Sequence, residues 1–168
     1  MTLPLPELKQ PAALPAELRA CTAFLLARVG YAIKLSAIEA FERQGFGLYQ
    51  YSVLAVLGEG AKEAQATIAD TLNLDPGQLV GVLDGLEDKG LVERRRDPKD
   101  RRRHTVSLTA EGKRQLVKMR TIVDKIEETF FAPLDAKARA ALRESLACVA
   151  ANYDRRLSGA GGGGSSAP

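Results

Sequence analysis

The sequence has few of the side chains from which catalytic and metal sites are built. His104 is the only histidine, and Cys21 and Cys148 are the only cysteines, in 168 residues. A zinc site or a histidine-based triad needs several such residues together, and these three are far from one another in the sequence. The acidic residues are scattered at helical spacing, and no glycine-rich cofactor loop accompanies them. We therefore expect no enzyme activity, no metal ion and no cofactor.

Disulfide bonds, a signal peptide and a membrane span also lack support. Two distant cysteines in a chain of this length are no disulfide framework, which fits a reducing cytoplasm. The N-terminus has no basic segment followed by an apolar run. The most apolar stretch, CTAFLLARVGYAIKL, is interrupted by Arg28 and Lys34. We expect a cytoplasmic protein without a membrane partner.

Length and composition favour one folded domain between two irregular ends. With 168 residues and 45% hydrophobic side chains, the chain is long enough for one buried core and short for two domains. Four prolines predict an extended arm over residues 1–15, and the Gly/Ser-rich residues 158–168 predict a flexible tail. The domain is expected over residues 16–157.

Helical periodicity begins and ends this domain. An unbroken pattern from Ala16 to about Gln44 predicts one long helix. Its apolar face would consist of Leu18, Cys21, Leu25, Val29 and Ala32. A last helix is expected from about Asp135 to Leu157. Together with the helix that follows Thr109, these helices have more apolar surface than one small core needs, which indicates either a helical dimer interface or packing within one chain.

Two further helices flank the centre of the domain. A short one is expected within YQYSVLAVLGEG, closed by Gly58 and Gly60. Thr109 is a suitable cap for another, whose apolar residues recur at heptad spacing. The members of that stripe are Leu116, Met119, Val123, Ile126 and Phe130.

Residues 64–92 have the pattern of a helix-turn-helix. Two helices are expected on either side of a tight turn around Asn73. Asp75 is a suitable N-cap for the second helix, and Pro76 suits its first position because the missing N–H would have no partner there. Gly90 suits the left-handed position past the end of that helix.

The second helix is expected to carry glycines on its outer face. Its leucines predict a core face, and Gly77 and Gly81 lie opposite. An interior glycine costs a helix about 0.8 to 1 kcal/mol relative to alanine. If this is a recognition helix, its contacts with DNA would offset this cost. The glycines would let its backbone enter the major groove closely, Gln78 could pair with adenine, and Val80 could touch a thymine methyl. The N-terminus at Pro76 would suit a phosphate. The alternative is that solvent-facing glycines are simply tolerated.

Positive charge is concentrated in one segment after this motif. The chain has a formal charge of +3, whereas residues 94–103 contain seven basic and two acidic residues, a net charge of +5. The rest of the chain is therefore slightly acidic. Such a concentration indicates a dedicated anionic partner, most commonly nucleic acid.

The basic segment lies in a predicted β-hairpin, because LVERRR and RHTVSLT flank the turn sequence DPKD. Nothing nearby is expected to offset the arginines, so they are either solvated or held against an external polyanion. Directly after a helix-turn-helix, the hairpin would be a wing whose tip enters a minor groove. A plain solvated surface is the alternative.

The wing residues expected at DNA are Arg94, Arg95, Arg96, Lys99, Asp100, Arg101, Arg102 and Arg103. The first three would meet phosphates along the strand. Lys99, Arg101 and Arg102 belong to the tip, where Asp100 orients a neighbouring arginine.

The string LDGLEDKGLVERRRDPKDRRRHTVSLTAEG closely resembles the recognition-helix end and wing of the MarR (multiple antibiotic resistance regulator) family. The resemblance implies a mainly α, homodimeric winged helix-turn-helix with long N- and C-terminal dimerisation helices. It also implies binding to a pseudo-palindromic DNA operator, often as a repressor released by a small ligand or an oxidant. In that family the Asp-x-Arg of the wing, here Asp100 and Arg102, is the common feature of the minor-groove contact, and residues around Gln65 to Thr67 would contact the DNA backbone.

The sequence departs from this family pattern in two places. Many members have serine, threonine and arginine where this chain has Gly77, Gln78 and Gly81, so its operator cannot be taken from a relative. The peroxide-sensing branch uses a cysteine at a position that falls here on Leu26. Cys21, about a turn away, is expected to be packed and inert, with sensing left as the alternative.

A ligand pocket would be expected between the dimer helices and the winged lobe, near Tyr31, Phe46 and Tyr49. Simple core packing is the alternative for these aromatic residues. For the whole chain, the leading interpretation is a sequence-specific DNA-binding transcription regulator. The rival is a winged helix used as a protein-interaction or dimerisation module without DNA binding, which would not need seven clustered cations.

Overall fold

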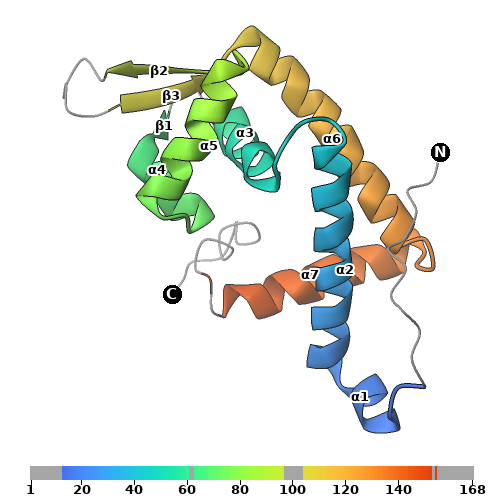
Figure 1. Ribbon diagram of the computed structural model, residues 1–168. Coiled ribbons are helices and arrows are strands. Elements are labelled where there is room, and N and C mark those ends of the chain that lie inside the picture. The colour runs from blue at the N-terminus through green and yellow to red at the C-terminus, as the bar shows by residue number, and fades with distance from the viewer. Residues whose placement is uncertain (1–12, 61–62, 97–103, 153, 155–168) are drawn as a thin grey trace, which may run out of the picture. The chain divides into compact units, whose positions relative to one another are not determined.

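The structure is a computed structural model that describes residues 13–60, 63–96, 104–152 and 154. The chain divides into two compact units, Met1–Phe130 and Phe131–Pro168. The first unit contains the helices α1 (Ala16–Ala20), α2 (Thr22–Glu42), α3 (Leu48–Glu59), α4 (Gln65–Leu72), α5 (Pro76–Asp88) and α6 (Ala110–Phe130), and the strands β1 (Glu63–Ala64), β2 (Val92–Arg96) and β3 (His104–Leu108) (Figure 1). The second unit contains α7 (Ala136–Ala151).

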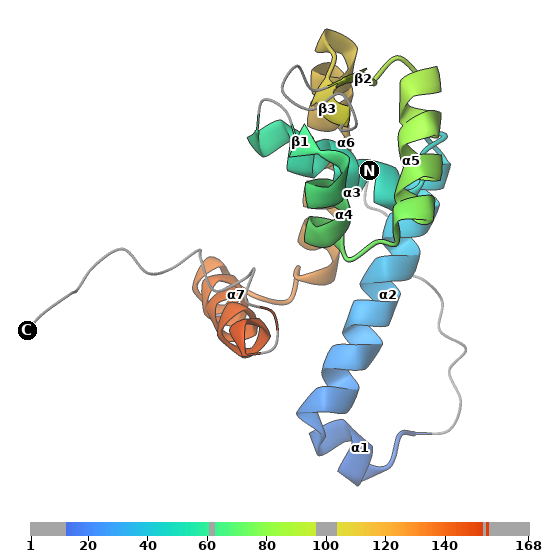
Figure 2. The same cartoon turned by 90° about the vertical axis from the view of Figure 1, so that its left-hand side faces the viewer.

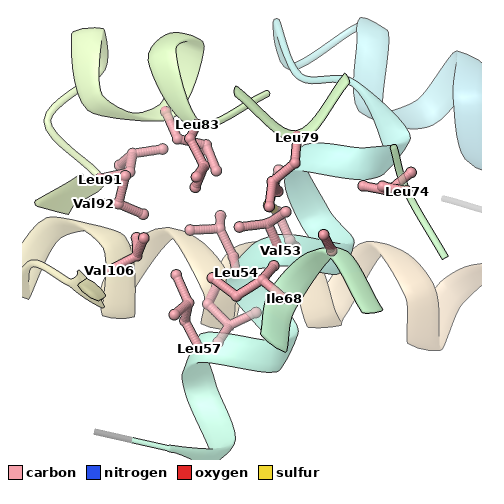
Figure 3. Close-up of a cluster of buried hydrophobic side chains, with 14 of the residues drawn as sticks. Val53, Leu54, Leu57, Ile68, Leu74, Leu79, Leu83, Leu91, Val92 and Val106 are labelled. Atoms are coloured by element: carbon pink, nitrogen blue, oxygen red, sulfur yellow. The ribbon is translucent and has the colours of Figure 1, made fainter. Parts of the chain in front are cut away.

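The core of the first unit forms where α3, α4, α5, α6 and the sheet meet. Leu54, Ile68 and Leu83, from three different helices, are completely buried and point toward one another (Figure 3). Burying one such side chain stabilises a fold by about 1.5 to 3 kcal/mol. Phe41 of α2 joins this core by stacking on Tyr51, with ring centroids 5.1 Å apart. The core therefore fixes the helix-turn-helix against α3 and α6.

The heptad stripe of α6 is confirmed as an inward face. Leu116, Met119 and Ile126 are buried, and Val123 and Phe130 are half-buried. Gly58 and Gly60 were both expected to close α3, but the helix runs through Gly58 and ends at Glu59, with Gly60 as its C-cap. Tertiary packing explains the difference, because a Cβ at Gly58 would lie 2.5 Å from Leu116 Cδ2. Gly58 is thus a point of close approach between α3 and α6.

The prediction of one unbroken helix from Ala16 to about Gln44 is wrong at Cys21. This residue has extended backbone angles (φ −85°, ψ 106°) and separates α1 from α2, which ends at Glu42. On the expected apolar face, Leu25 and Val29 are 45% and 43% exposed. The N-terminal part of the pattern has no buried residue before Ala32, so helix formation there depends on local propensity, which is weak over short lengths.

Three antiparallel strands form the sheet, in the order β1-β3-β2. The predicted hairpin is confirmed, with Val92 opposite Leu108 and Arg96 opposite His104. The sequence did not predict β1, whose two residues pair with Val106 and Thr105. Two residues are too few to show the alternation by which a strand is recognised.

The second unit is described only through α7 and its flanks. Asp135 is the N-cap, and its Oδ1 accepts the backbone N–H of Ala138 at 2.8 Å. The helix ends at Ala151, earlier than the expected Leu157, and residues 155–157 lie outside the described part of the chain. Its apolar residues are largely exposed, Val149 by 55%, and none of the described residues of α7 is buried.

No helix among the described residues has the length and apolar character needed to cross a bilayer.

Candidate nucleic-acid interface

A helix-turn-helix is formed by α4 and α5, which pack against each other (Figures 1 and 2). The turn depends on Asn73, which adopts a left-handed conformation (φ 50°, ψ 45°) that asparagine tolerates better than most residues. The backbone N–H of Leu74 then bonds to the carbonyl of Ala69 at 3.0 Å, and the Leu74 side chain is buried. This turn lets α5 begin at the surface.

The start of α5 matches its sequence prediction. Asp75 Oδ1 accepts the backbone N–H of Gln78 at 2.9 Å, and Pro76 occupies the first helical turn. The end also matches, because Gly90 has φ +68° and the N–H groups of Gly90 and Leu91 bond to the carbonyls of Glu87 and Leu86. Both ends of the candidate recognition helix are thus fixed by its own sequence.

Two opposite faces divide α5 as predicted. Leu79, Leu83 and Leu86 are buried in the core. Pro76, Gly77, Gln78, Val80 and Gly81 are all exposed. A Cβ at Gly81 would meet no atom of the chain within 4 Å. The exposed face is therefore smooth and open, and another molecule can approach its backbone closely.

Two residues of α4 were expected at a DNA backbone. Thr67 is exposed and Gln65 is half-buried at the first position of the helix. Neither belongs to the buried core. Their contact with a DNA backbone stays a prediction.

The structure describes the base of the predicted wing. Arg95 and Arg96 of β2 and His104 of β3 are exposed. Lys99, Asp100, Arg101, Arg102 and Arg103 lie outside the described residues. The assignment of the wing tip to DNA therefore stays a prediction.

The expectation that nothing nearby offsets the arginines is wrong for Arg94. Its Nη2 lies 2.6 Å from Asp84 Oδ1 and 2.5 Å from Glu87 Oε2, both on α5. The side-chain hydrogen bond to Glu87 is the main cause that raises the pKa of Arg94, and the same bond lowers the pKa of Glu87. The sequence signal was the spacing of Asp84 and Glu87, three residues apart and hence on one side of a helix.

Arg95 and Arg96 differ from Arg94 in their exposure. Arg95 Nη2 pairs with Glu93 Oε2 at 2.9 Å, but both side chains are largely in solvent. Such a pair contributes little to stability and is easily exchanged. Within the described residues, Arg96 has no carboxylate partner. The strand thus directs one arginine inward and leaves two at the surface.

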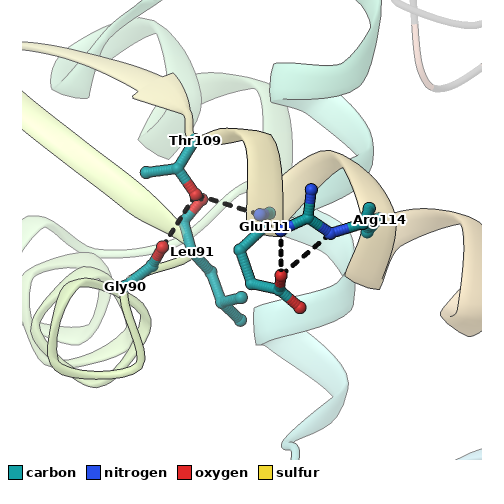
Figure 4. A network of polar contacts seen from close by, with 6 residues as sticks. Gly90, Leu91, Thr109, Glu111 and Arg114 are labelled. Atoms are coloured by element: carbon teal, nitrogen blue, oxygen red, sulfur yellow. Dashed lines mark hydrogen bonds and ion pairs between the residues drawn. The ribbon is translucent and has the colours of Figure 1, made fainter.

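A threonine joins the end of α5, the wing and the start of α6. Thr109 Oγ1 donates to the carbonyl of Gly90 at 2.7 Å and accepts the backbone N–H of Gly112 at 3.0 Å (Figure 4). The second bond confirms Thr109 as the cap of α6. A Cβ at Gly112 would lie 2.0 Å from the carbonyl oxygen of Leu91, so only glycine fits there. This junction holds the base of the wing against α6.

The aromatic residues suggested for a ligand site are not brought into one cavity. Tyr31 is 59% exposed and lines a hollow of about 290 Å³ together with Phe24, Ala27 and Arg28. Phe46 packs on the core with the ammonium of Lys89 5.5 Å from its ring centroid. Tyr49 is exposed on α3. Neither Phe46 nor Tyr49 lines the hollow. Of the four residues that line it, only Tyr31 was predicted from the sequence as a ligand-site residue.

The prediction of a packed Cys21 is wrong within this chain, because Cys21 is exposed. Of the apolar stripe to which it was assigned, Ala32 is buried, whereas Leu18, Leu25 and Val29 are exposed. Among the described residues, no group of three or more His, Cys, Asp or Glu side chains could hold a metal ion.

Comparison with known proteins identifies the family. A model of the MarR family matches residues 44–103, which include α3, α4, α5 and β2. The structure of a MarR-family transcriptional regulator from Rhodococcus sp. RHA1 is 33% identical, with a TM-score of 0.69, and the match covers 83% of this chain and 96% of that one. The chain belongs to the MarR family. Its winged helix-turn-helix is therefore the fold of that family.

Other relatives of this MarR-family chain carry ligands in their structures. The repressor CouR bound to a 23-mer DNA duplex is 30% identical, with a TM-score of 0.74, over 83% of this chain and 99% of that one. CouR from Rhodococcus jostii RHA1 bound to p-coumaroyl-CoA is 34% identical, with a TM-score of 0.68, over 81% and 96%. The transcriptional regulator HosA of Escherichia coli O111:H- is 32% identical over 52% of this chain and 65% of its own. The chain spans less than two thirds of the length of the first curated relatives that it matches.

Proposed function

We propose that this chain is a cytoplasmic transcription regulator that binds a double-stranded DNA operator as a homodimer, acts as a repressor and is released by a small ligand. The observation that carries the proposal is the outer face of α5, which is exposed and almost without side chains at Gly77 and Gly81. A major groove admits an α-helix, and a bare backbone approaches base edges closely. The relative CouR, with the same fold, is bound to a DNA duplex in its structure.

The wing supports DNA over a protein partner. The side chains of Arg95 and Arg96, at the base of the hairpin, are exposed to solvent. The sequence of the segment that follows adds four further basic residues. Protein interfaces are depleted of charge at their centre, whereas phosphate backbones require it. A protein-interaction module would have to leave this charge unused.

Titration of labelled duplexes at several salt concentrations tests the proposal. Duplexes are selected by the protein from a random-sequence pool and compared with unselected duplexes. For DNA binding, log K falls with log[salt] at a slope of about −0.9 per neutralised phosphate, so two wings give a steep dependence. Failure to enrich any sequence, together with a flat salt response, would reject DNA binding and favour the interaction module.

A homodimer is supported by the exposed apolar side of α2. Leu25, Leu26 and Val29 are each more than 40% exposed within one turn of one another. Scattered apolar residues are normal at a surface, but a contiguous row along a helix marks an interaction site. A second copy of the chain would cover it and place two recognition helices for a pseudo-palindromic operator.

The hollow on α2 supports release by a small aromatic anion. Phe24 and Tyr31 present ring surfaces, and the guanidinium of Arg28 lies 5.9 Å from the Phe24 ring centroid. These side chains match an aromatic acid or its thioester, and the relative CouR binds p-coumaroyl-CoA in its structure. The test adds p-coumaroyl-CoA, p-coumarate or coenzyme A to the protein–DNA complex. The hollow is supported if p-coumaroyl-CoA or p-coumarate releases the DNA from wild type and from Tyr49→Ala but not from Tyr31→Ala. Release of the DNA from Tyr31→Ala at the wild-type ligand concentration contradicts this site.

A further inference from the structure

Two carboxylates of α5 hold one arginine of the wing strand β2. Arg94 Nη2 contacts Asp84 Oδ1 and Glu87 Oε2, and Arg94 Nε donates to the same Glu87 oxygen at 2.8 Å. The other oxygen of Glu87 accepts the backbone N–H of Arg94 at 3.2 Å. Glu87 therefore binds both the side chain and the main chain of Arg94, across the turn that separates the helix from the strand.

The contacts of Arg94 differ from the other ion pairs of the described residues in burial and in what they connect. Its side chain is 23% exposed, compared with 66% for Arg95 and 65% for Arg114. The Arg95–Glu93 pair lies within one strand, and the Arg114–Glu111 pair lies within one helix. Of these three sets of contacts, only those of Arg94 join two elements, the recognition helix and the wing strand.

We propose that Arg94 is a positioning residue that fixes the direction of the wing relative to α5, and that its charge is used within the subunit and not on a DNA phosphate. This inference rests on the proposed DNA-binding function. A helix and a hairpin that enter neighbouring grooves must keep a fixed angle, because rotation at their junction displaces the distant tip most. Thr109 holds the turn at Gly90 from the side of α6, and Arg94 holds it from the side of α5.

The two roles of Arg94 predict opposite effects when its carboxylates are neutralised. If Arg94 contacted a phosphate, Glu87 would be a competing acceptor and a negative charge near DNA. Its removal would then strengthen binding to every duplex. If Arg94 positions the wing, removal of Glu87 releases the hairpin and weakens binding to the selected sequence. The sign of the change in affinity therefore separates the roles.

The first experiment compares Glu87→Gln with Glu93→Gln in the full chain. Each variant loses one carboxylate that is paired with an arginine. In Glu93→Gln, the amide oxygen can still accept the hydrogen bond that the Ser107 hydroxyl donates to Glu93. The probes are a duplex selected by the wild-type protein and a random-sequence duplex. We expect Glu87→Gln to bind the selected duplex roughly tenfold more weakly, within the range of one lost specific interaction, without loss on the random duplex. Glu93→Gln should bind both at least as well as wild type. Equal or tighter binding of the selected duplex by Glu87→Gln overturns the inference.

The second experiment uses Arg94→Lys, which keeps the charge and loses the planar fork. Lysine replaces arginine well as a point charge at a phosphate but cannot hold both carboxylates in one geometry. We expect weakened binding to the selected duplex, with the wing footprint lost and the major-groove footprint retained. Affinity and footprint equal to wild type contradict a positioning role.

These outcomes are separable from simple unfolding and from failure of the proposed function. A partly unfolded variant loses both footprints together, and its thermal midpoint shows the loss. If the wild-type protein selects no duplex at all, the DNA-binding proposal itself fails. If wild type selects a duplex and Glu87→Gln binds it more tightly, only the role of Arg94 is refuted.

Discussion

At the residue scale, the glycines of α5 separate the requirements of folding from those of binding. Gly81 faces open space and Gly85 faces the end of the flexible Gln50 side chain, although both lie inside the same helix. Alanine at either position raises helix propensity by about 1 kcal/mol. The difference between them is what the new methyl group would meet, open space at Gly81 and the Gln50 side chain of α3 at Gly85. The pair is therefore a matched probe of the outer face.

We predict that Gly81→Ala is more stable than wild type and yet binds its selected DNA at least about tenfold more weakly, because the methyl group separates the helix from the base edges. Gly85→Ala should gain less stability, since its Cβ would lie 2.9 Å from Gln50 Nε2, and should leave DNA affinity unchanged. Urea denaturation and fluorescence anisotropy with labelled duplex measure the two properties. Wild-type DNA affinity in Gly81→Ala would show that its outward glycine is merely tolerated.

Another residue-scale consequence concerns pH, through Glu87. Its pKa lies below the ordinary value of 4.5, chiefly because of the hydrogen bond from the Arg94 side chain. A lowered pKa in the folded state means that the ion pair contributes fully above 4.5, and that this contribution is lost as pH falls through the lower folded value. The pKa of Arg94 is raised above its ordinary value, so its contribution is lost only at strongly alkaline pH and has no effect in the acid range.

We therefore predict that wild type is more stable than Glu87→Gln at neutral pH and that the difference in unfolding free energy shrinks below the ordinary carboxyl pKa. Protonated Glu87 and glutamine are then nearly equivalent partners for Arg94. Urea denaturation of both proteins across acidic and neutral pH measures the difference. A difference that stays constant through the acid range would mean that the charge of Glu87 stabilises nothing.

At the scale of elements, the junction of wing and α6 depends on close backbone contact. The hydroxyl of Thr109 donates to the carbonyl of Gly90 (Figure 4) and accepts the backbone N–H of Gly112. Gly112 lies directly against the carbonyl of Leu91. Both glycines are required, Gly90 by its positive φ and Gly112 by lack of space.

We predict that Gly112→Ala lowers the unfolding free energy by at least about 2 kcal/mol, because the Cβ would lie 2.0 Å from the Leu91 carbonyl oxygen and the backbone must shift. Helix propensity alone predicts the opposite sign, a gain of about 1 kcal/mol. Chemical denaturation distinguishes the two, with Gly81→Ala as the control in which propensity acts alone. A stabilised Gly112→Ala would show that α6 can move away from the strand without cost.

How far each element could be predicted depended on where its determinants lie. Asp75, Gly90 and Thr109 act on neighbouring backbone, so α5 and the start of α6 were found from the sequence. The strand β1 was missed because it forms by pairing with the distant strand β3. The break at Cys21 was missed because the apolar stripe predicted a packed face, whereas Leu25 and Val29 next to the break are exposed.

In the candidate site, too, features with local determinants were predicted and features that depend on distant residues were missed. The outer face of α5 follows from helical periodicity and was predicted. The role of Arg94 was not, because Asp84 and Glu87 become its partners only when β2 folds back along α5. A local charge count could not distinguish an arginine paired within the chain from one free for DNA.

At the scale of the whole molecule, the apolar row on α2 indicates that one chain is an incomplete unit. Leu25 and Val29 would each lose contact with water if a second copy packed along this helix, stabilising the pair by up to about 1.5 to 3 kcal/mol per fully buried side chain. A dimer also doubles the number of recognition helices and wings, so DNA affinity and oligomeric state must be coupled.

We predict that Val29→Glu is monomeric at concentrations at which wild type is a dimer, because a buried carboxylate without a partner is strongly unfavourable. Val117→Glu is the matched control, since Val117 on α6 is 62% exposed and lies outside the α2 row. Sedimentation velocity gives the oligomeric state, and anisotropy gives the affinity for the selected duplex. Loss of dimer and of tight DNA binding together in Val29→Glu, with both retained in Val117→Glu, would couple assembly to function. A dimeric Val29→Glu with wild-type affinity would place the interface elsewhere, and a monomeric Val29→Glu that still binds DNA tightly would show that a single helix and wing suffice.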